Sequence, residues 1–144
     1  MRTSPFRIEH RVFPAKLEDL ESMIGWIRSR IHGSIPKDND RRKIELAMEE
    51  ALVNVIFHAY PRHSRRALLE IIIQHLEDQS LEFKIIDKGL PFNPLLQVTK
   101  PNTKAPEERE EGGLGILFIR RCMDEVHYER HHPFNILTLI KKAM

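Results

Sequence analysis

One stretch, Arg42 to Tyr60, limits what this chain can fold into more than any other part of it. Winding it at about 100° per residue gathers its apolar side chains on one broad arc, the pattern of a helix that packs on a sheet. The arc consists of Ile44, Ala47, Met48, Ala51, Leu52, Val55, Ile56 and Ala59. Glu50, Asn54 and His58 follow at steps of four and form a polar stripe along its edge. On spacing alone these are solvated helix-edge residues, so their role depends on the rest of the chain.

Size and composition indicate one soluble globular domain over residues 1–144. The chain has 144 residues, 41% of them hydrophobic and 31% charged, with a net charge of +2. That charge gives no support to nucleic-acid or membrane binding through a basic surface. The sequence has no signal-peptide run and nothing near the roughly 20 apolar residues of a membrane span, so we expect a cytoplasmic protein. The single cysteine, Cys122, lies in an apolar helical pattern and is expected to be buried.

The remaining periodicities predict strands around three helices. A first strand is expected over Phe6–Phe13, with Phe6, Ile8 and Val12 on one face, and a first helix over Lys16–Ile31. Asp38, Asn39 and Asp40 supply an N-cap for the long helix, which stops at Pro61. Further strands are expected at 67–76, 81–87, 125–130 and 134–141, the first two forming an antiparallel hairpin.

Asp87 ends the buried face of the second hairpin strand. Alternation places it on the same side as Leu81, Phe83 and Ile85, so a carboxylate closes an apolar row. A charge in that position requires a partner, either from the protein or from a ligand.

Regular periodicity is absent from Lys88 to Glu111, a proline-containing stretch with an acidic end. A loop this long within a compact domain is typical of a lid or binding loop, whereas its acidic end alone is explained by solvation. It leads into Gly112-Gly113-Leu114-Gly115 and then a helical pattern from Ile116 to Val126. Glycines at a helix start suit an anion, although a plain tight turn explains them equally simply, and no P-loop or dinucleotide fingerprint is present.

Taken together, three ordered motifs carry a resemblance. Glu50-Ala51-x-x-Asn54-x-x-x-His58, Asp87-x-Gly89-x-Pro91-Phe92 and Gly112-Gly113-Leu114-Gly115 resemble the nucleotide-binding boxes shared by gyrase B, the heat-shock 90 chaperones, histidine kinases and mismatch-repair ATPases. The Pro-Phe form, the short lid and Met123-Asp124-Glu125-Val126 are similar to the branch of bacterial anti-sigma factor serine kinases. The resemblance implies an α/β (α+β) two-layer sandwich, the histidine kinase-like ATPase fold, with a mixed, mostly antiparallel sheet and three helices on one face.

That resemblance also implies roles for single residues. Glu50 would be the general base, and Asn54 would hold a Mg²⁺ that also binds the ATP phosphates. Asp87 would accept a hydrogen bond from the adenine amino group, with Gly89 letting the backbone pass close to the base. Thr138 would share a water with Asp87. The other implied nucleotide-binding residues are His58, Phe92, Gly112, Gly113, Leu114 and Gly115.

The function implied is an anti-sigma factor that uses Mg-ATP to phosphorylate a serine on an antagonist protein. Implied partners are a sigma factor, bound around the first helix, that antagonist and a second copy of the chain. Some kinases of this branch carry an arginine just before the last glycine box, where this chain has Glu111. The alternative is therefore an ATP-binding partner-switching module without efficient transfer. A detached histidine-kinase catalytic domain fits the Pro-Phe form less well.

Two further groups of residues have simpler explanations. His127, His131 and His132 flank a predicted turn without an acid or cysteine at ligand spacing, so a zinc site is disfavoured. Trp26 and Ile27 are expected in the core or at a dimer contact.

Overall fold

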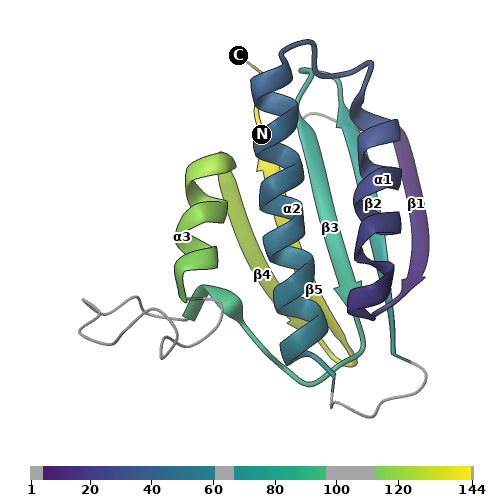
Figure 1. Cartoon of the computed structure of the whole chain (residues 1–144), viewed down its shortest axis with the longest axis vertical. Coiled ribbons are helices and arrows are strands. Elements are labelled where there is room, and N and C mark those ends of the chain that lie inside the picture. Colours follow the sequence, from purple (N-terminus) through teal and green to yellow (C-terminus); the bar gives the residue numbers. More distant parts are fainter. Residues whose placement is uncertain (1–4, 61–66, 97–112, 144) are drawn as a thin grey trace.

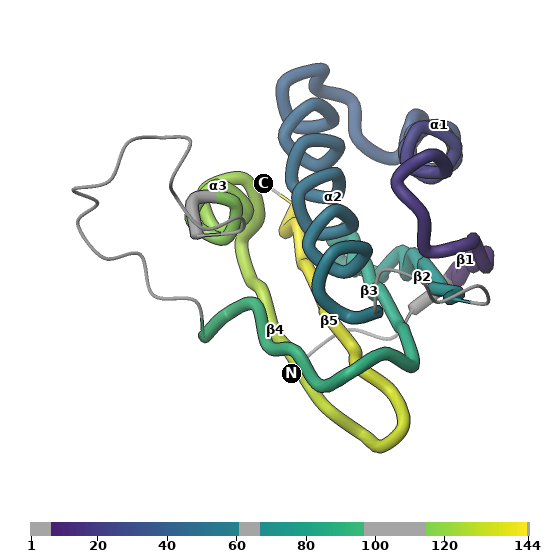
Figure 2. Tube along the Cα trace, turned by 60° about the horizontal axis from the view of Figure 1, so that its bottom comes forward, coloured from purple at the N-terminus to yellow at the C-terminus, as the bar shows by residue number. Residues whose placement is uncertain are grey.

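The chain folds into two layers, one of strands and one of helices. The computed structural model describes residues 5–60, 67–96 and 113–143. The elements are β1 (Pro5–Pro14), η1 (Leu17–Asp19), α1 (Leu20–Ile31), α2 (Asp38–His58), β2 (Leu68–Leu76), β3 (Leu81–Asp87), η2 (Pro94–Leu96), α3 (Gly113–Cys122), β4 (Glu125–His131) and β5 (Phe134–Lys141). All three α-helices cover the same face of the sheet (Figures 1 and 2), which confirms the predicted sandwich.

The strands form one five-stranded sheet in the order β1-β2-β3-β5-β4. Each pairing between neighbours is antiparallel, so the sheet that residues 5–60, 67–96 and 113–143 build has no parallel pair, although a mixed one was expected. In Figure 1, α1 lies over β1 and β2, α2 over β3 and β5, and α3 beside β4. α2 lies between α1 and α3 in the helical layer, so its polar residues Glu50, Asn54 and His58 lie near the centre of that layer.

Apolar side chains between the two layers form one continuous core. Its fully buried members come from all three α-helices and three strands, among them Met23, Ile27, Ile44, Met48, Leu52, Ile71, Phe83, Ile85, Ile119 and Leu139. Trp26 and Cys122 are buried as well, as the sequence predicts. Burial of such side chains contributes about 1.5–3 kcal/mol each, so this core is what holds α2 in place.

The structure differs from the predicted elements at two helix starts and in the exposure of one strand face. The first helix opens with the short turn η1 before α1 begins at Leu20. The long helix begins at Asp38 with Lys37 as its N-cap and no side-chain cap bond, so Asp38 and Asp40 lie in its first turn, where carboxylates favour the positive helix end. β1 is an edge strand as expected, but Ile8 and Val12 point away from the helices and are more than half exposed.

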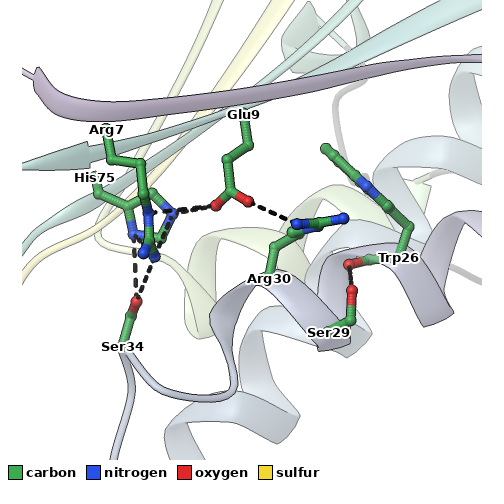
Figure 3. A network of polar contacts seen from close by, with 7 residues as sticks. All are labelled: Arg7, Glu9, Trp26, Ser29, Arg30, Ser34 and His75. Atoms are coloured by element: carbon green, nitrogen blue, oxygen red, sulfur yellow. Dashed lines mark hydrogen bonds and ion pairs between the residues drawn. The ribbon is translucent and has the colours of Figure 1, made fainter.

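A polar cluster joins β1 and β2 to the end of α1 (Figure 3), and we call it the edge network: Arg7, Glu9, Arg30, Ser34 and His75. Its centre is His75, which is only 2% exposed. The Glu9 carboxylate lies 2.8 Å from Nε2 of His75 and 3.2 Å from Nη1 of Arg30. Ser34 Oγ lies 3.2 Å from Nδ1 of the same histidine. Each member therefore has a partner inside the cluster.

Within the three segments that the structure describes, no helix is both long enough and apolar enough to cross a membrane.

Candidate functional site

The polar stripe of α2 faces the start of α3. A Cβ placed on Gly115 would lie 2.8 Å from Oε2 of Glu50 and 3.6 Å from Nδ2 of Asn54. A larger residue at position 115 would displace the Glu50 carboxylate, so glycine lets the first turn of α3 lie against these two side chains as they stand. Asn54 is 4% exposed, and its amide nitrogen has no hydrogen-bond partner among the described residues. A buried amide group left in that state is unfavourable unless something else binds there.

Asp87, at the end of β3, is held by two donors on one oxygen. Its Oδ1 accepts a hydrogen bond from the Gly89 N–H and another from Nδ2 of Asn135, both at 2.8 Å. The side chain is 4% exposed, and burial raises the pKa of the Asp87 carboxyl while Asn135, Gly89 and Arg130 oppose that rise. A carboxylate thus lies at the end of an apolar row, where the sequence places it.

Gly89 brings the chain after β3 directly against the end of α2. A Cβ at this position would lie 2.1 Å from the carbonyl oxygen of Ala59, a backbone clash that no side-chain movement relieves. The next residue, Leu90, donates its N–H to that same oxygen at 2.7 Å. The glycine therefore fixes the loop that follows Asp87 to the C-terminal end of the helix that carries Asn54.

One small cavity lies between these elements. Its lining combines Asn54, Val55 and Ala59 of α2 and its end with Asp87, Phe92, Pro94, Tyr128, Asn135 and Leu137. Phe92 stacks on His58, with ring centroids 4.4 Å apart and the planes 16° from parallel. Nε2 of His58 is buried without a hydrogen-bond partner in the described segments. Residues from the first and second motifs, more than thirty positions apart in sequence, thus share one apolar pocket with a carboxylate in its wall.

Thr138 does not belong to this pocket, and its predicted place beside Asp87 is wrong. In the β3–β5 register Thr138 pairs with Lys84, whereas Asp87 pairs with Asn135. Residues three apart on a strand point to opposite faces, so Thr138 lies on the face away from the helices. It lines a separate hollow with Glu82 and Lys84.

Sequence reasoning missed Asn135, Tyr128 and Arg130. Asn135 Oδ1 lies 2.5 Å from the Tyr128 hydroxyl and 3.2 Å from Nη1 of Arg130. The alternation of the strand could have found Asn135, because residues 135, 137 and 139 lie on one face of β5 and Leu137 and Leu139 are buried. An amide on the core face of a strand requires partners in the same way as a carboxylate.

A family model described as a histidine kinase-like ATPase domain matches residues 13–141. The chain belongs to this family. The matched range covers every element from the end of β1 to the end of β5, so the histidine kinase-like ATPase assignment concerns the whole fold and all three motifs.

Two curated proteins that are similar to this chain are named as protein kinases. The serine/threonine-protein kinase BtrW of Bordetella bronchiseptica is 28% identical over 99 residues, which cover 69% of this chain and 68% of that protein. The serine-protein kinase RsbW of Staphylococcus aureus is 32% identical over 94 residues, 61% of this chain and 57% of that protein. The chain thus matches little more than half the length of the staphylococcal relative.

Solved structures agree on the fold. The RsbU and RsbW domains of a Mycobacterium tuberculosis protein superimpose with a TM-score of 0.68 at 14% identity, over 96% of this chain and 33% of that one. A histidine kinase domain from Erythrobacter litoralis gives a TM-score of 0.52 at 16% identity over 85% of this chain and 60% of that one.

The pocket of this histidine kinase-like ATPase domain has the donor set that a nucleotide requires. The buried Asp87 carboxylate and Asn54, whose amide nitrogen is unpartnered, line the cavity, and Asn54 also lies beside Glu50 and beside Gly115 at the start of α3. Backbone N–H groups at a helix start favour phosphate, and an amide oxygen suits magnesium. The residues present therefore fit Mg-ATP.

Some predicted site residues fall beyond what can be described. Gly113 and Leu114 begin α3, whereas Gly112, Glu111 and the lid from residue 97 onward lie outside the described residues. The nearer part of the lid, 88–96, contains the short turn η2.

The histidines near the last hairpin have acidic neighbours. His127 lies 2.9 Å from Glu125, and His131 lies 3.1 Å from Glu129. Across residues 5–60, 67–96 and 113–143, no group of three or more His, Cys, Asp or Glu residues is placed to hold a metal ion.

Proposed function

We propose that this protein is an anti-sigma factor that uses ATP to phosphorylate a serine on an antagonist protein. The names of the bacterial relatives, serine/threonine-protein kinase BtrW and serine-protein kinase RsbW, support the kinase activity. The single observation that carries the proposal is the shared pocket: Asn54, Asp87 and Phe92 line it together, and Glu50 lies beside the start of α3.

The purine end of the ligand lies at Asp87. A carboxylate accepts hydrogen bonds and donates none, so it suits the amino group of adenine. Phe92, Leu137 and Val55 supply apolar surface for the ring. Gly89 would let the backbone pass beside the base. Independently of the base, its close contact with Ala59 leaves no room for a side chain.

The phosphate end lies along the α2 stripe and the start of α3. The Asn54 amide oxygen would hold Mg²⁺, which neutralises charge on the phosphates when bound. The backbone N–H groups of Gly112, Gly113, Leu114 and Gly115 would close over the phosphates. His58, one turn beyond Asn54, supports the pocket through its stack on Phe92.

Glu50 is the proposed general base. It takes the proton from the attacking serine hydroxyl as that oxygen bonds to the γ-phosphorus and ADP leaves. Its position beside Gly115 and one helical turn from Asn54 supports this role.

The proposed partners follow from the same branch of the family. A sigma factor would bind around α1 and neighbouring loops, and two copies of the chain would form a homodimer in the cytoplasm. Direct binding to nucleic acid or membrane is not part of the proposal. Glu111, in the place where some kinases have arginine, favours the second candidate, an ATP-binding switch with little transfer.

A transfer assay separates the two candidates. The protein is incubated with γ-labelled ATP, magnesium and the antagonist protein encoded near it, alongside Glu50→Gln and the control Glu49→Gln, whose side chain is exposed on the same helix. Label on an antagonist serine that disappears only in Glu50→Gln supports the kinase. ATP binding without transfer supports the switch, and absence of ATP binding overturns both.

A further inference from the structure

Three neighbouring strands place polar side chains in one row at the end of the sheet that borders the pocket. Asp87 of β3 pairs with Asn135 of β5, which pairs in turn with Arg130 of β4. Tyr128 stands two residues before Arg130 on the same face. We call Asp87, Asn135, Tyr128 and Arg130 the site network. Asn135, at its centre, is 4% exposed.

The orientation of the Asn135 amide is dictated by its neighbours. Arginine can only donate, and Nη1 of Arg130 lies 3.2 Å from one end of the amide, so that end must be the oxygen. The Tyr128 hydroxyl donates to the same oxygen. The amide nitrogen is then directed to Oδ1 of Asp87 and, at 2.9 Å, to the carbonyl oxygen of Leu90.

This arrangement divides the two oxygens of Asp87 between different tasks. Oδ1 accepts from Asn135 and from the Gly89 N–H. Oδ2 receives no hydrogen bond from the described residues, although Asp87 lines the pocket. A fixed carboxylate therefore offers one free acceptor to whatever enters.

We infer that Asn135, oriented by Tyr128 and Arg130, is a positioning and specificity-determining residue that sets Asp87 to select bases with an exocyclic amino group. The inference rests on the proposed function, because it needs a nucleotide in this pocket. Asn135 itself does not touch the reacting atoms; it acts through the carboxylate.

The chemistry of selection follows from the free oxygen. An ionised Oδ2 accepts from the 6-amino group of adenine but meets the acceptor oxygen of a 6-oxo purine. Leaving either acceptor unpaired in a buried site is unfavourable. The wild-type protein should therefore bind ATP about 10- to 100-fold more tightly than inosine triphosphate.

Asn135→Asp tests the positioning role, because it keeps the shape and replaces the donor with a second carboxyl group. Two adjacent carboxylates cannot both be ionised easily, so the pair takes up a shared proton. ATP affinity should fall about 10-fold or more at pH 8 and recover as the pH falls toward 6, where one protonated carboxyl again donates to Asp87. In the wild-type protein the pH dependence of ATP affinity is reversed, because protonation of Asp87 weakens ATP binding as the pH falls.

Other groups near Asp87 do not produce this reversal. Burial raises the pKa of Tyr60, so its hydroxyl stays neutral over this range. The remaining charged or ionisable groups there, Arg130, Tyr128 and His58, are the same in the wild type, in Asn135→Asp and in the control. The control is Asn39→Asp, an isosteric change on the exposed start of α2, which should keep the wild-type profile.

Tyr128→Phe provides a second test if the first variant does not fold. It removes one donor to the Asn135 oxygen, so ATP affinity and the ATP-to-inosine-triphosphate ratio should each fall about 3- to 10-fold. A wild type that binds no adenine nucleotide overturns the proposed function. A wild type that binds ATP, with a parallel pH profile in Asn135→Asp or an unchanged base preference in Tyr128→Phe, overturns this inference alone.

Discussion

The edge network and the site network are built from similar residues but differ in how completely they are paired. In the edge network, Glu9 lies between His75, Arg7 and Arg30, and Ser34 contacts the far side of the imidazole. In the site network, Asp87 keeps one oxygen without a described donor, and Asn54 across the pocket keeps an unpartnered amide nitrogen.

Burial shifts the titratable group of each network toward its neutral form. It lowers the pKa of His75 and raises the pKa of Asp87. Because the edge network closes on itself, its polar groups serve the fold. Because the site network stays open, its buried charge is unfavourable until a ligand supplies the missing donor. The contrast teaches that a buried polar cluster indicates a binding site only where pairing is incomplete.

The largest effect is expected from Asp87→Asn. The new side chain can still accept from Gly89 and Asn135 through its oxygen, but it presents a donor to the pocket. ATP affinity, measured by calorimetry, should fall about 10- to 100-fold.

The same variant should not lose stability. A raised carboxyl pKa means that Asp87 favours folding below its unfolded pKa and that this contribution is lost as the pH rises through its folded pKa. At pH 7 the ionised form therefore opposes folding, and its removal should leave the melting temperature unchanged or higher. A melting temperature several degrees lower would place Asp87 with the structural residues and break the comparison.

Glu9→Gln should give the reverse result. Three basic groups lose their shared carboxylate, which is 19% exposed, so urea denaturation should show a loss of about 1–2 kcal/mol. ATP affinity should stay the same, because the edge network lies at the β1–β2 edge of the sheet, whereas the pocket lies against β3, β5 and β4. The matched control is Glu70→Gln, whose partner His10 is exposed and should contribute under about 0.5 kcal/mol. Weaker ATP binding in Glu9→Gln would show that the two networks are coupled.

A smaller effect is expected from acid. The lowered pKa of His75 means that it contributes stability above its unfolded pKa of 6.5, and that this contribution is lost as the pH falls from there toward its folded pKa. Burial and Arg7 oppose its protonation, whereas Glu9 favours it. Below pH 6.5 the free energy of unfolding should drop by at most about 1.4 kcal/mol per pH unit, and His75→Gln should flatten that slope. An identical slope in the variant would assign the acid sensitivity to another group.

Much of the fold was predictable because an element that buries one face repeats its apolar residues at a fixed spacing. The apolar arc of α2 and the alternation in β3 follow directly from packing two layers, and both are confirmed. The turn η1 and the start of α2 at Asp38 were not predicted. Helix ends depend on local backbone hydrogen bonds, which residue propensities describe weakly.

The site was predictable only where a motif carried it. Asn54 of the first motif and Asp87 of the second line one cavity, while the roles of these residues toward a nucleotide stay predictions. The partner of Asp87 was assigned to the wrong residue. Thr138 was inferred from resemblance, whereas the strand register places Asn135 opposite Asp87. Alternation within β5 puts Thr138 on the face opposite Leu137 and Leu139, but which residue lies across from Asp87 depends on how two distant strands pair.

The smallest expected effect therefore tests the register itself. Thr138→Val keeps the side-chain shape on the face of β5 that lies away from the pocket, beside Lys84 and His127. Because Thr138 pairs with Lys84 and His127 and not with Asp87 or Asn135, ATP affinity and the preference over inosine triphosphate should change by less than about twofold, with stability within about 0.5 kcal/mol. If calorimetry instead showed a loss as large as that of Asn135→Asp, Asp87 would depend on Thr138. The partner of the carboxylate would then be the residue that the family motif implies, and the division between a closed and an open network would have to be drawn again.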